Sequence, residues 1–296
     1  MSTPSASASG TFLIGGDLPV ARLGYGTMRL VGDGAWGEPR DPEEARRVLR
    51  LAVDLGVSLI DTADAYGPEI AERLIAEALH PYPAGLVIAT KGGITRQGPA
   101  KTEYVGRAGY LIQCVEMSLR RLKLERIDLY QLHRIDPRTP LEESLGALKQ
   151  MQQQGKIRHI GLSEVTATEI EQARKIVPIV TVQNRYSLTD RRHEDTLNWC
   201  EQQGIGFMPW YPMAGGKQLK PDSPSAQTLN RIAARHSTTP AQLSIAWLLQ
   251  RSPVMLPIPG TSNVAHLREN IAASELKVDA EEWAQLEKAA AEATPQ

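Results

Sequence analysis

The chain has 296 residues, of which 42% are hydrophobic and 23% are charged, and its formal net charge at pH 7 is −1. This composition is typical of a folded soluble domain, and the near-zero charge argues against nucleic acid or an anionic membrane surface as the main partner. The two cysteines, Cys114 and Cys200, are too few for a disulfide framework or a metal-binding cluster. We therefore expect buried thiols and a cytoplasmic location.

The chain starts with ten small, polar residues, MSTPSASASG, which lack the basic start and apolar run of a secretory signal. We expect residues 1–10 to form a disordered tail. No stretch approaches the roughly 20 apolar residues of a membrane span. The next segment, TFLIGGDLPVAR (11–22), predicts two short strands around Gly15-Gly16-Asp17, which together form a β-hairpin.

Short β-rich runs alternate with helical patterns along the remaining sequence. Several of these runs are almost continuously apolar, as expected for strands whose two faces are both covered. The predicted strands are residues 23–28, 57–62, 86–91, 127–133, 157–163, 179–184, 204–211 and 254–260.

The helices between these strands have recognisable N-terminal signals. The sequence DPEE places Asp41 at an N-cap, a proline at the first helical position and Glu44 at the capping-box position. The segments 139–142 (TPLE) and 239–242 (TPAQ) repeat this pattern, and Asp279 begins a C-terminal helix in a similar way.

Eight strands that alternate with helices over about 250 residues predict a (β/α)8 barrel, with the hairpin at its N-terminal end and an extra C-terminal helix. The alternative is a doubly wound sheet, but no predicted strand is followed by a G-x-G-x-x-G turn. We expect one domain over residues 11–296. Because a closed barrel leaves no sheet edge to pair, a monomer is the default expectation.

Catalytic residues of such barrels lie at the C-terminal ends of the strands. In general, an ammonium group near a phenol stabilises the phenolate and lowers the pKa of the phenol, and a nearby carboxylate holds the ammonium group in place. Asp61, Lys91 and Tyr66 can form such a chain and lower the pKa of Tyr66, which would then act as a general acid. A histidine can orient a substrate oxygen. The polar or aromatic residues at the predicted strand ends are Asp61, Tyr66, Lys91, His133, Ser163, Gln183 and Trp210.

This set contains no paired Ser or Cys nucleophile and no metal-ligand cluster. These side chains can deliver a proton to an oxygen atom but cannot supply electrons, so a separate group must supply them. Motifs over almost the whole chain resemble those of the aldo-keto reductase superfamily. They are GVSLIDTADAYG (56–67), IATKGG (88–93), LYQLHRID (129–136), GKIRHIGLSE (155–164), VQNRYSL (182–188), PWYPMAGG (209–216) and IPGTSNVAHLREN (258–270).

The resemblance implies Asp61, Tyr66, Lys91 and His133 as the catalytic residues. It also implies that NADPH, rather than NADH, donates a hydride to a carbonyl carbon while Tyr66 protonates the oxygen. Ser163 and Gln183 would hold the nicotinamide carboxamide, Trp210 would stack on the ring in place of the usual tyrosine, and YPMAGG (211–216) would surround the pyrophosphate. The cofactor residues implied are Thr27, Met28, Ser163, Gln183, Trp210, Tyr211, Pro212, Met213, Gly215, Gly260, Thr261, Ser262, His266, Glu269 and Asn270.

Besides Trp210, the chain departs from the family pattern at three positions. Glu164 stands where many members have Asn, and Gly260 and His266 stand where many have basic residues around the adenosine 2′-phosphate. Ser262, Asn263 and His266 are the remaining candidates for that phosphate. Arg268 is not one of them, because helical spacing places it on a different face from residues 266, 269 and 270.

The chain looks most like bacterial reductases, one branch of which reduces pyridoxal to pyridoxine, so the resemblance implies pyridoxal as the leading substrate. The substrate mouth would be lined by the loop around Trp36, the segment after His133 and the loop after Met213. Two other functions remain open. One is a cofactor-binding regulatory or redox-sensing subunit without turnover, and the other is a Schiff-base enzyme that uses Lys91.

Overall fold

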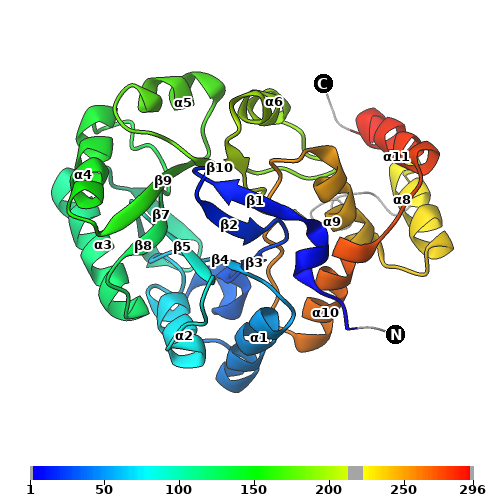
Figure 1. Cartoon of the computed structure of the whole chain (residues 1–296), viewed down its shortest axis with the longest axis horizontal. Coiled ribbons are helices and arrows are strands. Elements are labelled where there is room, and N and C mark those ends of the chain that lie inside the picture. Colours follow the sequence, from blue (N-terminus) through cyan, green and yellow to red (C-terminus); the bar gives the residue numbers. More distant parts are fainter. Residues whose placement is uncertain (1–2, 213–222, 294–296) are drawn as a thin grey trace.

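A parallel sheet of seven strands forms the centre of the computed structural model, which describes residues 3–212 and 223–293. The strand order is β3-β4-β5-β8-β9-β10-β11, and helices surround the sheet (Figure 1). Two antiparallel hairpins, β1-β2 and β6-β7, lie outside it. The strands are β1 (Thr11–Ile14), β2 (Leu18–Ala21), β3 (Tyr25–Gly26), β4 (Leu59–Asp61), β5 (Val87–Gly92), β6 (Ile94–Gly98), β7 (Lys101–Tyr104), β8 (Ile127–Leu132), β9 (Ile157–Ser163), β10 (Thr181–Gln183) and β11 (Gly206–Phe207).

Residues 254–260, predicted as the eighth strand, close the barrel without forming a regular strand. The N–H of Leu256 donates to the carbonyl of Phe207 (2.7 Å), and the carbonyl of Pro257 accepts from the N–H of Gly24 (2.9 Å). The segment thus bridges β11 and the chain just before β3. Prolines at 253, 257 and 259 have no N–H to donate, so the hydrogen-bond ladder cannot continue. The barrel prediction is confirmed, with this irregular closing segment.

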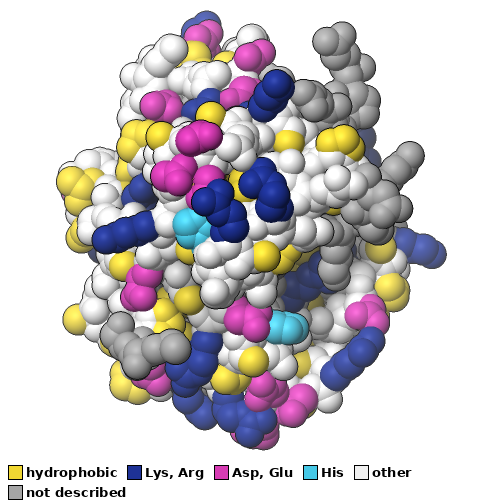
Figure 2. All heavy atoms as spheres, turned by 90° about the vertical axis from the view of Figure 1, so that its right-hand side faces the viewer, with side chains coloured by type: hydrophobic (Ala, Val, Ile, Leu, Met, Phe, Trp, Pro, Cys, Tyr) yellow, Lys and Arg dark blue, Asp and Glu magenta, His cyan; other side chains and the backbone are white. Residues whose placement is uncertain are grey.

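The helices form a ring around the sheet, with α8 and α11 packed against each other outside it (Figure 1). The extra C-terminal helix is therefore confirmed. On the face that bears α8 and α11, basic and acidic side chains are interspersed (Figure 2). The helices are α1 (Pro42–Asp54), α2 (Ile70–Leu79), α3 (Ala108–Leu122), α4 (Leu141–Gln153), α5 (Ala167–Arg174), α6 (Glu194–Gln203), α8 (Pro224–Arg235), α9 (Pro240–Arg251), α10 (Val264–Ala272) and α11 (Ala280–Ala293).

All four predicted helix starts are confirmed, and three of them have the predicted cap. The carboxylate of Asp41 caps α1, Thr239 forms a capping box at α9, and Asp279 accepts from the N–H of Glu282 (2.8 Å) before α11. At 139–142 a helix begins as predicted, at Leu141, but the predicted cap is wrong: Pro140 rather than Thr139 directly precedes α4, and the Thr139 hydroxyl donates to Asp136 instead (3.1 Å).

The predicted hairpin β1-β2 lies at the N-terminal end of the barrel. Asp17 at its turn pairs with Arg158 (2.9 Å) and His159 (2.6 Å), which begin β9. Its apolar residues pack with the inward-facing residues of the barrel strands, namely Ile14, Leu18 and Val20 against Leu59, Val87, Ala89, Leu129, Met208 and Leu256. The hairpin therefore plugs this end, and the functional site must lie at the other.

The predicted disordered tail is wrong for residues 3–10. Ala6–Ser9 forms the short 3-10 helix η1, and Ala6 is fully buried. The N–H of Ala6 donates to Leu55 (2.8 Å), and the Ser9 hydroxyl accepts from the N–H of Leu23 (2.9 Å). A mostly polar segment is thus fixed to the barrel by hydrogen bonds and by the packing of one buried alanine.

Cys114 and Cys200 are free and buried, as expected. Among the described residues, no helix is both long enough and apolar enough to cross a membrane.

Candidate active site

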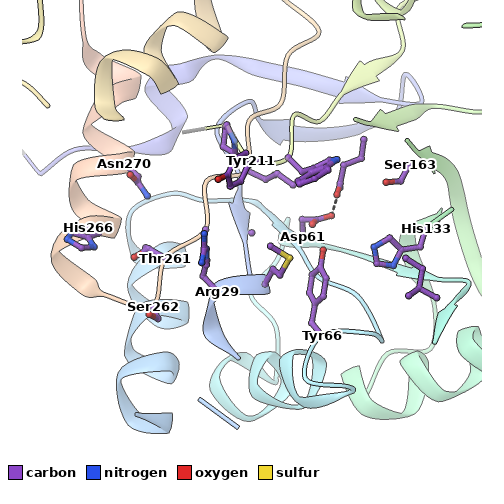
Figure 3. Close-up of a pocket in the computed structure, with 18 of the residues that line it drawn as sticks. Arg29, Asp61, Tyr66, His133, Ser163, Tyr211, Thr261, Ser262, His266 and Asn270 are labelled. Carbon is purple, nitrogen blue, oxygen red and sulfur yellow. Dashed lines mark hydrogen bonds between the residues drawn. The ribbon is translucent and has the colours of Figure 1, made fainter. Parts of the chain in front are cut away.

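A cavity of about 790 Å³ opens at the C-terminal ends of the barrel strands. Tyr66, His133 and Ser163 lie at one end of it, and His266 and Asn270 on α10 lie at the other, with Arg29 and Tyr211 between (Figure 3). The cavity is therefore elongated, and its two ends differ in the residues they offer.

Lys91, at the end of β5, joins Asp61 to Tyr66. Its ammonium group donates to the Asp61 carboxylate (2.7 Å), to the carbonyl of Thr62 (2.7 Å) and to the Tyr66 hydroxyl (3.3 Å). An ammonium group has three N–H donors, so these partners satisfy the fully buried Lys91 and fix its direction. The amide groups of Gln183 (2.8 Å) and Gln131 (3.2 Å) hold the other Asp61 oxygen.

The pKa values of Lys91 and Tyr66 both lie above their ordinary values. Burial disfavours the charge on Lys91, but the neighbouring Asp61 and Tyr66 outweigh burial and raise its pKa. Burial also raises the pKa of Tyr66, and the positive charge of Lys91 opposes this shift without cancelling it. The sequence-based expectation of a lowered tyrosine pKa is therefore wrong in the free protein. The consequence is that Tyr66 is protonated at neutral pH, which is the form that donates a proton.

His133, which follows β8, lies edge-on to Tyr66, with ring centroids 6.1 Å apart and an interplanar angle of 82°. Its Nδ1 is buried and has no hydrogen-bond partner in the described part of the chain. Burial, together with the charges of Lys91, Arg134 and Arg96, holds the pKa of His133 well below its ordinary value. The imidazole is therefore neutral, with one N–H to donate.

Two departures from the family pattern, Glu164 and Trp210, contact each other. One oxygen of Glu164 accepts both from the indole N–H of Trp210 (2.5 Å) and from the backbone N–H of Arg185 (2.6 Å). Burial opposes the charge of Glu164, but hydrogen bonds from His193, Trp210 and the Arg185 backbone outweigh it and lower its pKa to about 2. A permanently ionised carboxylate thus holds the indole ring at the cavity wall.

The guanidinium group of Arg185 lies over the rings of Trp210 (5.7 Å) and Tyr211 (5.1 Å) and pairs with Asp190 (2.8 Å). This cation–π contact packs the two aromatic residues together. Ser163, predicted to contact the nicotinamide, already accepts a hydrogen bond from Arg134 (2.8 Å).

The other end of the cavity is formed by the 3-10 helix η2 (Met28–Leu30), the segment before α10, and α10 itself. The side chain of Asn263 caps α10 by accepting from the N–H groups of Ala265 (2.8 Å) and His266 (3.1 Å). The buried side-chain nitrogen of Asn270 has no partner among the described residues, so this end presents an unused donor.

Gly260 has a structural reason to be glycine. A Cβ at this position would lie 2.7 Å from the carbonyl oxygen of Gly26, because the closing segment runs tightly against β3. A basic side chain at position 260 is therefore excluded by packing.

The cavity contains most of the residues predicted from the sequence, but not all of them. Thr27 is fully buried and does not line it; its hydroxyl donates to the Asp61 carbonyl (3.1 Å). Trp36 is 38% exposed and does not line it either. Met213 and Gly215 lie outside the described residues. Predicted residues that do line it are Met28, Asp61, Tyr66, His133, Ser163, Gln183, Trp210, Tyr211, Pro212, Gly260, Thr261, Ser262, His266, Glu269 and Asn270.

Several lining residues were missed by the sequence analysis. Arg29 and Arg134 directly follow the predicted residues Met28 and His133, so their sequence positions already indicated that they lie near the cavity. Four others come from the hairpin β6-β7, which no sequence pattern indicated: Ile94, Arg96, Thr102 and Tyr104. The remaining ones are Gly26 and Ile258, in predicted barrel strands, and Thr239 and Ala241, at the start of α9.

Comparison with known proteins gives a consistent result. The family model described as "Aldo/keto reductase family" matches residues 22–291. An uncharacterized oxidoreductase of Schizosaccharomyces pombe is 46% identical over 97% of this chain and 92% of its own length. Pyridoxine 4-dehydrogenase of Escherichia coli is 44% identical over 93% of this chain and 96% of its own. The crystal structure of an aldo/keto reductase from Klebsiella pneumoniae in complex with NADP and acetate has a TM-score of 0.80 at 28% identity, covering 97% of this chain and 96% of that one.

Proposed function

Because this chain belongs to the aldo/keto reductase family, we propose that it reduces an aldehyde or ketone to an alcohol, with NADPH as the cofactor and Tyr66 as the general acid. The observation that carries the proposal is the position of the Lys91 ammonium, 2.7 Å from Asp61 and 3.3 Å from the Tyr66 hydroxyl.

The nicotinamide of NADPH, when bound, supplies a hydride to the carbonyl carbon. The protein supplies the proton: the Tyr66 hydroxyl protonates the carbonyl oxygen, and Lys91 stabilises the phenolate that remains until solvent reprotonates it. Asp61 keeps Lys91 charged and in place. The neutral His133 donates a hydrogen bond to the same carbonyl oxygen and orients it. Carbon and oxygen thus receive one hydride and one proton, which together make the alcohol.

The cavity fits a dinucleotide. Its volume of about 790 Å³ lies within the range of cofactor sites, and its elongated shape separates the Tyr66 end from the α10 end (Figure 3). Ser163, Gln183 and Trp210 are the residues that would hold the nicotinamide. Asn270, with its unused buried donor, and Arg29 would hold the adenosine half.

Pyridoxal is the substrate we propose to test first. The support is the 44% identity to pyridoxine 4-dehydrogenase of Escherichia coli over 93% of this chain.

The alternative of a Schiff-base enzyme is disfavoured by the surroundings of Lys91. A nucleophilic lysine must lose its proton, usually because its pKa is lowered. Here Asp61 and Tyr66 raise the pKa of Lys91, and the amine makes three hydrogen bonds with its protons. Such an amine cannot attack a carbonyl carbon.

Replacement of Tyr66 by phenylalanine tests the proposal. We expect Tyr66→Phe to bind NADPH normally, measured by quenching of tryptophan fluorescence, but to reduce pyridoxal about 10²–10⁴-fold more slowly, which is the usual contribution of a general acid. Tyr82→Phe is a suitable control, because the Tyr82 hydroxyl donates to the carbonyl of Leu122 (2.7 Å), away from the cavity.

Near-normal turnover in Tyr66→Phe would contradict the role of Tyr66. If the wild-type protein binds NADPH tightly but reduces none of a panel of aldehydes, the regulatory or redox-sensing function is favoured instead.

A further inference from the structure

Arg96, on the hairpin β6-β7, lines the active-site cavity beside Tyr66 and His133. Its guanidinium group donates to two backbone carbonyls, those of Ala65 (2.6 Å) and Gly34 (3.2 Å). These bonds fix the side chain against the loop that carries Tyr66. A guanidinium group has five N–H donors, so two of them are used within the described part of the chain.

No carboxylate pairs with Arg96 among the described residues, and this distinguishes it from another half-buried arginine. Arg121 is held by Glu72 (2.6 Å) and Glu69 (3.0 Å). Burial of Arg96, by contrast, lowers its pKa, and among the described residues only an ionised Tyr66 opposes this shift. Its positive charge is therefore desolvated without a resident anion.

Arg22 also lacks a carboxylate partner in the described residues, but its donors are used differently. Its guanidinium group donates to four carbonyls, those of Ser9, Leu249, Ser252 and Met255. Arg22 thus has a structural role that consumes its hydrogen-bonding capacity. Arg96 makes half as many such bonds and faces an open cavity.

The other charges around the cavity leave this end positive. Two acidic residues in the described lining are Asp61, which is neutralised by Lys91, and Glu269, which lies on α10 at the opposite end. Arg134 also lines the cavity next to His133, but the ionised Glu164, which holds Trp210, offsets part of its charge. A desolvated cation in such surroundings favours an anion in the cavity.

We propose that Arg96 binds an anionic oxygen of the substrate, so that the enzyme prefers carbonyl compounds that carry a carboxylate, phenolate or phosphate group. This inference rests on the proposed reductase function and specifies its substrate class. Tyr104 on the same hairpin is 39% exposed and lines the cavity. It offers an aromatic surface, so an aromatic aldehyde with an anionic substituent fits both residues.

The test uses two aldehydes of nearly equal shape, the anion 4-carboxybenzaldehyde and the neutral 4-formylbenzamide. For the wild-type enzyme with NADPH, we expect kcat/KM to be about 10-fold to 100-fold higher for the anion, as for a hydrogen bond to a charged group. This preference should shrink with added salt. In Arg96→Gln the anion should lose most of its advantage, and Arg96→Lys, which keeps the charge, should retain part of it.

Arg50→Gln is the matched control, because Arg50 is an exposed arginine that donates to the carbonyl of Ala78 (3.3 Å) outside the cavity. It should leave the preference unchanged. Equal kcat/KM for the two aldehydes in the wild-type enzyme, or an undiminished preference in Arg96→Gln, would overturn the proposal.

A binding experiment separates failure of this inference from failure of the reductase function. Calorimetric titration of the protein with benzoate and with benzamide requires no turnover. Tighter binding of benzoate that is lost in Arg96→Gln supports the anion site even if no aldehyde is reduced. Equal binding of the two ligands contradicts it even if the enzyme is an active reductase.

Discussion

At the scale of single residues, Trp210 and Glu164 are best understood as a pair. The indole N–H needs an acceptor when it is half-buried, and Glu164 provides one at 2.5 Å. A tyrosine at position 210 has no such N–H in the ring, and an asparagine at position 164 is too short and uncharged to replace the carboxylate. Each departure from the family pattern therefore accommodates the other.

This interdependence predicts a non-additive double-mutant cycle. Glu164→Asn and Trp210→Tyr should each weaken NADPH binding, and the double variant should bind more tightly than the sum of the two losses predicts. The coupling free energy should be about 1 kcal/mol or more, as for residues in direct contact. Calorimetry is the suitable measurement, since one variant removes a fluorophore.

A second tryptophan–glutamate pair serves as the control for this cycle. Trp199 donates to Glu171 (3.2 Å) on the exposed surface between α6 and α5. Glu171→Asn should leave NADPH binding unchanged. Strictly additive losses at positions 164 and 210 would contradict the pairing.

Asp64, three residues after Asp61, provides a prediction about pH. Burial, reinforced by the charge of Glu72, raises the pKa of Asp64 from its ordinary value of 3.8 to about 7. The folded state therefore binds this proton more tightly than the unfolded state, so the contribution of Asp64 to stability falls as the pH rises from about 4 to about 7.

Asp64→Asn removes this titration while keeping the side-chain shape. At pH 8 the variant should be more stable than the wild type by on the order of 3 kcal/mol. At pH 4 the two proteins should be equally stable. Urea unfolding at both pH values measures the difference, and an equal effect at the two pH values would show that the Asp64 carboxyl does not titrate in this range.

At the scale of secondary-structure elements, the hairpin β6-β7 shows what a sequence pattern cannot reveal. It projects at the barrel mouth, and only Ile94 and Gly98 of its strands are buried. A hairpin with so little apolar surface has no hydrophobic alternation to detect. Arg96 and Tyr104 could not be assigned to the cavity from the sequence, because their positions depend on this hairpin.

Two elements, η2 and α10, line the part of the cavity away from Tyr66, and among their described lining residues Arg29 carries the permanent positive charge. Arg29 lies on η2, between the Tyr66 end of the cavity and His266 on α10 (Figure 3). The N–H groups of Ala265 and His266 at the start of α10 are already bonded to Asn263. A 2′-phosphate would therefore depend on the Arg29 side chain more than on the helix N-terminus.

We expect Arg29→Gln to weaken binding of NADPH by about tenfold or more, the effect of losing a charge-assisted hydrogen bond, and to weaken binding of NADH much less. Arg268→Gln is the control, because Arg268 lies on α10 but does not line the cavity. Fluorescence titration with both cofactors measures the ratio. An equal loss for NADPH and NADH would show that Arg29 does not contact the phosphate.

At the scale of the whole molecule, the barrel and the convergence of Asp61, Tyr66, Lys91 and His133 were predictable for one physical reason. Buried parallel strands have continuous apolar runs, and the C-terminal ends of all barrel strands meet at one mouth. The closing segment 254–260 also has an apolar run and was therefore predicted as a strand, although its prolines prevent a regular hydrogen-bond ladder. The N-terminal segment has no such pattern, because its order comes from hydrogen bonds to distant residues and from a single buried alanine.

That segment leads to a prediction opposite to the one its composition suggests. Deletion of residues 1–9 removes the buried Ala6, its bond to Leu55 and the acceptor for the N–H of Leu23. Loss of these two hydrogen bonds, at about 1 kcal/mol each, should lower the thermal midpoint of a chain of this length by roughly 3 °C. Deletion of residues 1–4 leaves these contacts intact and should have no effect. Because η1 lies beside the plugged end of the barrel rather than beside the cavity, kcat should be unchanged in both variants. An unchanged thermal midpoint after deletion of residues 1–9 would mean that the segment contributes nothing to stability.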